Sequence, residues 1–288
     1  MQRSCALREA LDHFTSTQSR LQIVYATDPA WASRKPKHIA VLDASFNPPT
    51  HAHLALASMP LIPDDPHAAF DTHLLIFSVR NADKGSGRPG DATALQRLEM
   101  MELFAKQLER DVQRTTQKDA CVAIALVNEP LVFSKSTLVR DYFGAAHSPF
   151  LYWLMGSDTI TRVFQARYYG SEQALNEKCE QFFRVEQSTI LCAQRSSESV
   201  HDGTQRAAHS DDDQARALAA LLEKSGPCRY WYEHGAIQLR TLDTEIGRHS
   251  STAVRRFLQY GAETHSTLSD MVPGGLAGYL VANSVYKP

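Results

Sequence analysis

Short apolar runs alternate with segments of helical periodicity along most of the chain. We expect strands at the apolar runs, which lie at 21–26, 38–45, 73–79, 121–129, 150–156, 188–194 and 236–242. We expect helices at 4–16, 53–59, 93–112, 136–143, 157–164 and from 250 onward. The run 38–45 is apolar nearly throughout, as is typical of a strand covered on both faces. The alternation predicts an α/β fold, with a mostly parallel sheet and helices on both faces.

One segment departs from this alternation. Residues 195–214, RSSESVHDGTQRAAHSDDDQ, are polar and poor in apolar side chains, a composition typical of an exposed, disordered insertion. A helix is expected directly after it, at 215–224. The chain shows no internal repeat and no other linker. We therefore expect a single domain at 38–288, preceded by a helix and strand extension at 1–37.

Composition and charge narrow the class of protein. The 288 residues are 43% hydrophobic and 22% charged with a net charge of −2, so nothing draws the chain generally to nucleic acid or an anionic membrane. Five scattered cysteines, odd in number and without a CxxC pair, argue against zinc and against a disulfide framework. No stretch reads as a secretory signal or a membrane span. We expect a soluble cytoplasmic protein, with the nucleus as a further compartment.

Polar clusters follow the ends of several predicted strands. They are SFNPPTHAH (45–53), SVRNADK (78–84), SKST (134–137), GSD (156–158) and HSSTAVR (249–255). Ligands of open α/β sheets bind beyond the carboxyl ends of the strands, so these clusters are expected to meet around one ligand.

The first cluster suits a phosphate. A helix that begins near Thr50 would point free backbone N–H groups at the crevice between strand and helix. His53 would lie on the same side of the first turn, where it could donate a hydrogen bond to a phosphoryl oxygen. The alternative is a histidine with a purely structural role.

The last cluster resembles a second anion site. Ser250, Ser251 and Thr252 are good N-cap residues, and Arg255 follows one turn later. The alternative is an ordinary capped helix with an exposed arginine. Lys84 could contact a phosphate, or it could be an ordinary solvated lysine in a loop. Asp158 could accept hydrogen bonds from ribose hydroxyls, or it could simply cap a helix.

The absence of other motifs limits the chemistry. The sequence contains no GxxxxGK(S/T), no GxGxxG, no GxSxG and no metal-spaced cluster of His and Cys. Phosphate cradles without a nucleophile favour direct phosphoryl or nucleotidyl transfer through positioning and charge stabilisation.

These clusters resemble a known family. The stretch FNPPTHAH (46–53) resembles the (H/T)xxH signature of the nucleotidyltransferase superfamily, and HSSTAVR (249–255) its ISSTxxR signature. SVRNADK, RLEMMEL (97–103) and LMGSDTITRVFQ (154–165) are similar to further segments of the nicotinamide/nicotinate mononucleotide adenylyltransferases, most of all a divergent fungal branch. The resemblance covers 38–286 and implies a Rossmann-like, doubly wound sheet.

The resemblance also implies roles for individual residues. The residues implied to bind ATP are Ser45, Phe46, Asn47, Thr50, His53, Gly156, Asp158, Ser250, Ser251, Thr252 and Arg255. Those implied to bind the pyridine nucleotide are Ser45, Phe46, Lys84, Thr137 and Tyr168, with Tyr169 as a second candidate for stacking on the ring. His53, Lys84 and Arg255 would stabilise charge in the transition state.

The implied reaction joins ATP, with Mg²⁺ on its phosphates, to nicotinamide or nicotinate mononucleotide, giving NAD or its deamido precursor and pyrophosphate. No nucleic-acid or membrane partner is expected. Two alternatives remain open from the sequence. One is the same chemistry on another acceptor, such as a phosphopantetheine. The other is an ATP-binding or ATPase-like regulator without NAD synthesis.

Overall fold

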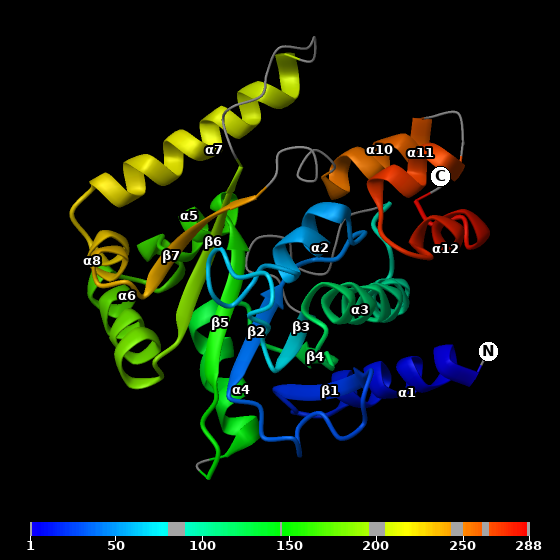
Figure 1. Cartoon of the computed structure of the whole chain (residues 1–288), viewed down its shortest axis with the longest axis horizontal. Helices are drawn as coiled ribbons and strands as arrows, with labels where there is room; N and C mark the ends of the chain where they lie inside the picture. Colours follow the sequence, from blue (N-terminus) through cyan, green and yellow to red (C-terminus); the bar gives the residue numbers. More distant parts are fainter. Residues whose placement is uncertain are drawn as a thin grey trace.

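A computed structural model of the chain describes residues 2–79, 90–144, 146–195, 205–242, 250–260 and 265–286 (Figure 1). Within these ranges seven strands form one sheet, in the order β1-β4-β3-β2-β5-β6-β7. All neighbouring pairs are parallel except β1 with β4. The chain order reverses between β2 and β5, so the predicted doubly wound, mostly parallel sheet is confirmed.

The strands lie where the apolar runs predict them, with ends within two residues. Their bounds are β1 (Leu21–Ala26), β2 (His38–Asp43), β3 (Thr72–Ser78), β4 (Val122–Val127), β5 (Phe150–Gly156), β6 (Thr189–Arg195) and β7 (Ile237–Leu242). Strand β1 belongs to the segment expected as an N-terminal extension, and its pairing with β4 makes that segment part of the same sheet.

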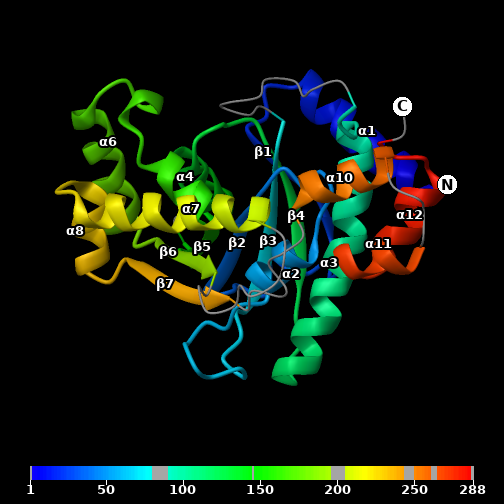
Figure 2. The ribbon, with the colours of Figure 1, turned by 90° about the horizontal axis from the view of Figure 1, so that it is seen from above.

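One face of the sheet is covered by helices from both ends of the chain (Figures 1 and 2). These are α1 (Gln2–Ser16), α2 (His51–Ala57), α3 (Ala94–Thr116), α10 (Ser251–Tyr260), α11 (His265–Met271) and α12 (Leu276–Ala282). Ala40 and Leu42 of β2 face this layer, and Phe104 of α3 is fully buried within it. The alternate residues Ile39 and Val41 face the other layer, as the period of a strand requires.

The second layer contains α4 (Val132–Phe143), α5 (Ser157–Val163), the 3₁₀ turn η1 (Ala166–Tyr168), α6 (Glu172–Cys179), the π-helical turn η2 (Glu180–Val185), α7 (Gln205–Glu223) and α8 (Pro227–Glu233). Stacked and tilted aromatic rings, among them Phe133, Phe182, Phe183 and Trp231, fill the space beneath these helices. No helix in the described ranges combines the length and the apolar character that crossing a bilayer requires.

The structure corrects one expectation about this layer. Residues 205–214, expected to be a disordered insertion, form the first half of α7; residues 196–204 lie outside the described ranges. The second half of α7 buries Leu218 completely. Packing of this second half provides a helical nucleus. The helix extends from it toward the N-terminal end of α7, through residues whose composition alone would not favour order.

Candidate active site

A cleft of about 790 Å³ opens along the carboxyl edge of the sheet. Its lining comes from both sides of the strand reversal. The turn between β2 and α2 contributes Ser45 and Asn47, and the first turn of α2 contributes His53; across the cleft, Gly156 ends β5 and Asp158 lies in the first turn of α5. These predicted site residues, distant in sequence, therefore share one cavity at the switch point of the sheet.

His53 is held by the residue that begins its own helix. The backbone N–H of Thr50 donates to Nδ1 of His53 at 3.2 Å, and the Thr50 hydroxyl lies 2.9 Å from the same nitrogen. A backbone amide can only donate, so Nδ1 is an acceptor and the proton of the neutral ring lies on Nε2. The Nε2–H group is therefore the donor that His53 can offer to a ligand.

The protonation of His53 follows from its surroundings. Burial lowers the pKa of His53 to about 4, against a smaller raising effect of the Asp158 carboxylate. The ring also packs against Phe46, with 5.7 Å between ring centres. At neutral pH His53 is therefore uncharged and donates a hydrogen bond without carrying a formal charge.

Two residues of the same turn do not present their side chains to the cleft. Thr50 is fully buried, and its hydroxyl serves His53. Phe46 is also fully buried and packs on Phe104 as well as on His53. The resemblance implies that both residues contact nucleotide, which stays a prediction; in the structure both side chains contact His53.

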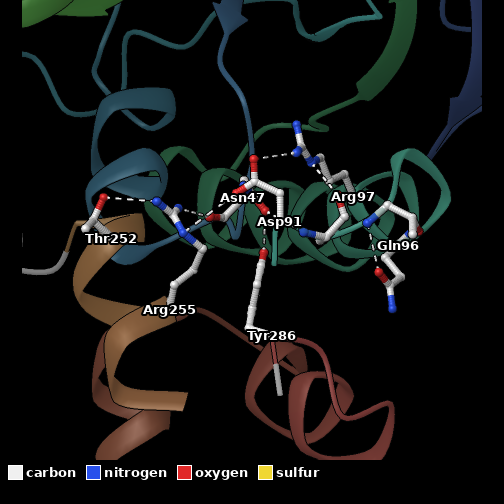
Figure 3. Close-up of polar contacts among 9 residues, drawn as sticks. Asn47, Asp91, Gln96, Arg97, Thr252, Arg255 and Tyr286 are labelled. Atoms are coloured by element: carbon white, nitrogen blue, oxygen red, sulfur yellow. Dashed lines mark hydrogen bonds and ion pairs between the residues drawn. The ribbon is translucent and has the colours of Figure 1, made fainter. Parts of the chain in front are cut away.

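Asn47 joins the cleft to three other segments of the chain (Figure 3). Its Nδ2 donates to Oδ1 of Asp91 at 2.7 Å. Its Oδ1 accepts from the backbone N–H of Ala92 at 3.2 Å and from the hydroxyl of Tyr286 at 2.8 Å. Asp91 also pairs with Arg97 at 3.5 Å. Sequence reasoning identified Asn47 and marked Arg97 only as the first residue of the segment RLEMMEL, without a role; it missed Asp91 and Tyr286, since no local pattern marks them.

Arg255 reaches the same turn from α10. Its Nη1 donates to the backbone carbonyl of Asn47 at 2.6 Å, and its Nη2 donates to the Thr252 hydroxyl at 3.2 Å (Figure 3). Its Nε lies 4.0 Å from Oδ1 of Asp91. Arg255 does not itself line the cleft, but it contacts two residues that do. The structure therefore brings the Arg255 guanidinium and His53 to the same turn.

The hydroxyl groups at the start of α10 dock and cap the helix. Ser251 donates to the backbone carbonyl of Pro48 at 2.7 Å, and Ser250 accepts from the backbone N–H of Ala253 at 3.2 Å. Neither serine, nor Thr252, lines the cleft. These contacts fix α10 against the turn after β2.

The opposite side of the cleft combines a glycine with a carboxylate. A Cβ atom at Gly156 would lie 3.0 Å from Oδ1 of Asp158, so a side chain there would crowd the carboxylate and shift it slightly. Asp158 is 55% exposed and pairs with Arg162 at 3.4 Å. The carboxylate therefore lies where hydroxyl groups of a ligand could donate to it.

A buried ion pair in the cleft was missed by sequence reasoning. Lys135 of α4 pairs with Asp43, the last residue of β2, and both line the cleft. The cluster SKST drew attention to Thr137 instead. Two positions along a helix correspond to about 200° of rotation, so Lys135 and Thr137 face opposite ways.

Thr137 does not line the cleft, and its implied role in binding the pyridine nucleotide stays a prediction. Its hydroxyl donates to Oε1 of the buried Glu186 at 2.6 Å, and Ser136 donates to Oε2 at 2.5 Å. These bonds satisfy a carboxylate that would be costly to bury alone. Thr137 therefore serves the packing of α4 against η2.

Two tyrosines form an aromatic wall. Tyr168 and Tyr169 both line the cleft. The ring of Tyr169 stacks on Phe133 of α4, with 5.7 Å between centres, and its hydroxyl donates to the carbonyl of Val163 at 2.9 Å. Arg167 lies over the ring of Tyr168, 4.8 Å from its centre.

The charges around the cleft are mixed. Its described lining includes the acids Asp12, Asp43, Asp91 and Asp158 and the bases Arg97, Lys135 and Arg162. Lys84, predicted to bind phosphate, and His249 of the last cluster lie outside the described residues. In the part of the chain that is described, no three His, Cys, Asp or Glu side chains are grouped to hold a metal ion.

The chain is similar in sequence to a protein of Schizosaccharomyces pombe named "Putative nicotinamide mononucleotide adenylyltransferase". The two are 30% identical over 256 residues, which cover 88% of this chain and 86% of the relative. No family model matches the sequence. Two solved structures of Plasmodium falciparum nicotinic acid mononucleotide adenylyltransferase are also similar, one complexed with APC (TM-score 0.47, 11% identity) and one with NaAD (TM-score 0.49, 12% identity). Each alignment covers 87% of this chain and 97% of the other.

Proposed function

The chain belongs to the nicotinamide mononucleotide adenylyltransferase family of nucleotidyltransferases, and from this premise we propose that it transfers AMP from ATP to a pyridine mononucleotide. The products would be NAD or its deamido precursor and pyrophosphate. The observation that supports the proposal is a cleft lined by the neutral His53, Asn47 and Asp158, with Arg255 bonded to the backbone of Asn47.

On this proposal the triphosphate lies beside the turn after β2. The Nε2–H group of His53 donates to an α-phosphoryl oxygen as negative charge builds in the transition state. Because Thr50 already fixes Nδ1, the ring is oriented before the substrate arrives, which is the condition for efficient electrostatic catalysis. Arg255, together with Lys84, would neutralise the remaining phosphate charge.

The adenosine would lie toward β5. Asp158 would accept hydrogen bonds from ribose hydroxyls, and the absence of a Cβ at Gly156 would let the nucleotide approach the backbone closely. The aromatic wall of Tyr168 and Tyr169 would border the pyridine ring.

The chemistry needs no covalent enzyme intermediate. A phosphate oxygen of the mononucleotide attacks the α-phosphorus in line, one P–O bond forms, and the bond to the β-phosphate breaks with release of pyrophosphate. The protein contributes alignment and charge stabilisation. Mg²⁺ would arrive with the ATP substrate, since this ion is commonly bound through substrate phosphates and water.

The test is product formation with a panel of acceptors. Purified full-length chain is incubated with Mg·ATP and, in parallel, nicotinamide mononucleotide, nicotinate mononucleotide and phosphopantetheine; dinucleotide and pyrophosphate are measured. We expect a dinucleotide from at least one pyridine mononucleotide. Turnover of phosphopantetheine alone would assign another acceptor. Binding of ATP by calorimetry without any adenylylated product would overturn the proposal in favour of a regulatory role.

A further inference from the structure

The Asp43–Lys135 ion pair lies in the cleft, yet adenylyl transfer as described above makes no use of it. Only 4% of the Lys135 side chain and 16% of the Asp43 side chain are exposed. Removing two charges from water is costly, and a pair of this kind is seldom the most stable filling for a buried site. Its position in the cleft indicates that the pair contacts a bound ligand.

Both partners have hydrogen-bonding capacity left over. The Lys135 ammonium has three N–H donors, and among the described residues only Asp43 is found to accept from it. The Asp43 oxygen that does not face Lys135 receives a long contact of 3.5 Å from the Ser78 hydroxyl. A donor and an acceptor therefore lie side by side in the cleft.

The pair shares its cleft with the two tyrosines of the aromatic wall. Val132 and Lys135 are three positions apart on α4, share one face of that helix and both line the cleft. Tyr168 and Tyr169 line the same cleft as Asp43 and Lys135. A flat ring bound in this cleft against the tyrosines would therefore share it with the polar groups of the pair, which a ring substituent could meet.

We propose that the Asp43–Lys135 pair selects the carboxamide form of the pyridine mononucleotide over the carboxylate form; this inference rests on the proposed function. A primary carboxamide is neutral and has both an acceptor oxygen and N–H donors. Lys135 would donate to the oxygen, and one amide N–H would donate to Asp43.

The carboxylate form fits the pair poorly. It offers only acceptors, and its negative charge would face Asp43 in a site largely shielded from water, where like charges repel strongly. Lys135 alone would attract a carboxylate. It is therefore the presence of Asp43 that turns the preference toward the amide.

The test compares kcat/KM for nicotinamide and nicotinate mononucleotide at saturating Mg·ATP. We expect the wild-type chain to favour the amide by about tenfold or more, since one repelled or unpaired polar group changes specificity by at least that factor. Asp43→Asn removes the negative charge with little change of shape, so the preference should fall by about tenfold or reverse, with the KM for ATP unchanged. Ser134→Ala, on the same helix outside the cleft lining, is the matched control and should keep the wild-type ratio.

The outcomes separate the two proposals. If neither mononucleotide is turned over, the proposed function itself is overturned. If both are turned over without preference, or if Asp43→Asn keeps the wild-type ratio, the selection by this pair is wrong and the proposed function stands. Should Asp43→Asn unfold, the variant Asp43→Asn/Lys135→Gln, which removes both buried charges together, is measured in its place and should lose the preference.

Discussion

Arg255 donates a 2.6 Å hydrogen bond from Nη1 to the backbone carbonyl of Asn47, a residue 208 positions earlier in the chain. Asn47 in turn donates to Asp91, which lies 4.0 Å from the Arg255 Nε. Helix α10 is thereby attached to the turn that carries His53. A guanidinium has five N–H donors, so those that do not bond to the turn can still donate to an anionic ligand.

Replacing Arg255 should weaken the stabilisation of negative charge on the phosphates of ATP. We expect Arg255→Ala to raise the KM for ATP and lower kcat, with a combined loss of about 10²-fold in kcat/KM. Arg255→Lys should recover little of the lost kcat/KM, because a single ammonium cannot reproduce the planar set of donors of a guanidinium. Steady-state kinetics with varied ATP measure both values. Arg256→Ala changes the exposed neighbour and serves as control; equal kinetics for Arg255→Ala and Arg256→Ala would contradict the assignment.

Because Thr50 bonds to His53, variants at these two positions should lower kcat by different amounts. His53→Ala should lower kcat by about 10²–10³-fold, the loss seen when one transition-state donor is removed. Thr50→Val keeps the backbone N–H bond to Nδ1 but removes the hydroxyl, so a smaller loss of roughly several-fold is expected, and Thr50→Ser should restore activity. In the His53→Ala background, Thr50→Val should cost almost nothing more. Full additivity of the two losses would show that Thr50 acts independently of His53.

A side chain at Gly156 should crowd the carboxylate of Asp158. The added Cβ would lie 3.0 Å from Oδ1, so Gly156→Ala should shift the carboxylate slightly and raise the KM for ATP by roughly a few-fold, less than the effect of one lost hydrogen bond to a charged group. Gly275→Ala is the control, because a Cβ there meets nothing within 4 Å. Isothermal titration with ATP would check the result, and an unchanged Kd in Gly156→Ala would refute it.

Tyr286 connects the C-terminal segment to the cleft. Its hydroxyl is almost completely buried and donates to Asn47, and burial raises its pKa. Tyr286→Phe should lower the free energy of unfolding by about 1 kcal/mol, the usual net contribution of one hydrogen bond. The cost stays this small because Oδ1 of Asn47 still accepts a hydrogen bond from the backbone N–H of Ala92. Urea denaturation measures this value. Tyr232→Phe, at a partly exposed position, should leave the stability unchanged.

Two histidines predict a loss of stability in acid. Burial lowers the pKa of both His53 and His73 from 6.5 to about 4. Between these pH values the unfolded chain binds protons that the folded chain does not, so the free energy of unfolding should be highest above pH 6.5 and should fall as the pH decreases toward 4.

His73 provides the cleaner test, because its side chain is buried and its Nδ1 has no hydrogen-bond partner within the described structure. His73→Gln should flatten the acid decline by about 3 kcal/mol at most between pH 7 and 4, the value expected for one histidine with this shift. Urea unfolding at several pH values gives the slope. Parallel curves for the wild type and His73→Gln would rule out protonation of His73 as a cause.

The strands could be predicted because a buried strand has a recognisable pattern of apolar residues in the local sequence. A strand covered on both faces is a short apolar run, and β2 and β5 lie where such runs occur. The neighbourhood of the site could be predicted for a related reason, since the carboxyl ends of parallel strands must meet. The clusters at 45–53 and 156–158 therefore line one cleft. The short segments η2 and α8 escaped prediction because they pack on one another through aromatic rings across the layer, a contact that no local pattern records.

What each side chain does was decided only by the tertiary structure. Thr50 and Phe46 belong to the signature of the site, yet both are buried behind His53. On α4 it is Lys135, and not Thr137, that faces the cleft. The sequence by itself determined which segments meet, because strand order and hydrophobic patterning constrain the backbone. The direction of a side chain and its distant partners, such as Arg255 for Asn47, depend on how separate helices pack, and no local pattern encodes that packing.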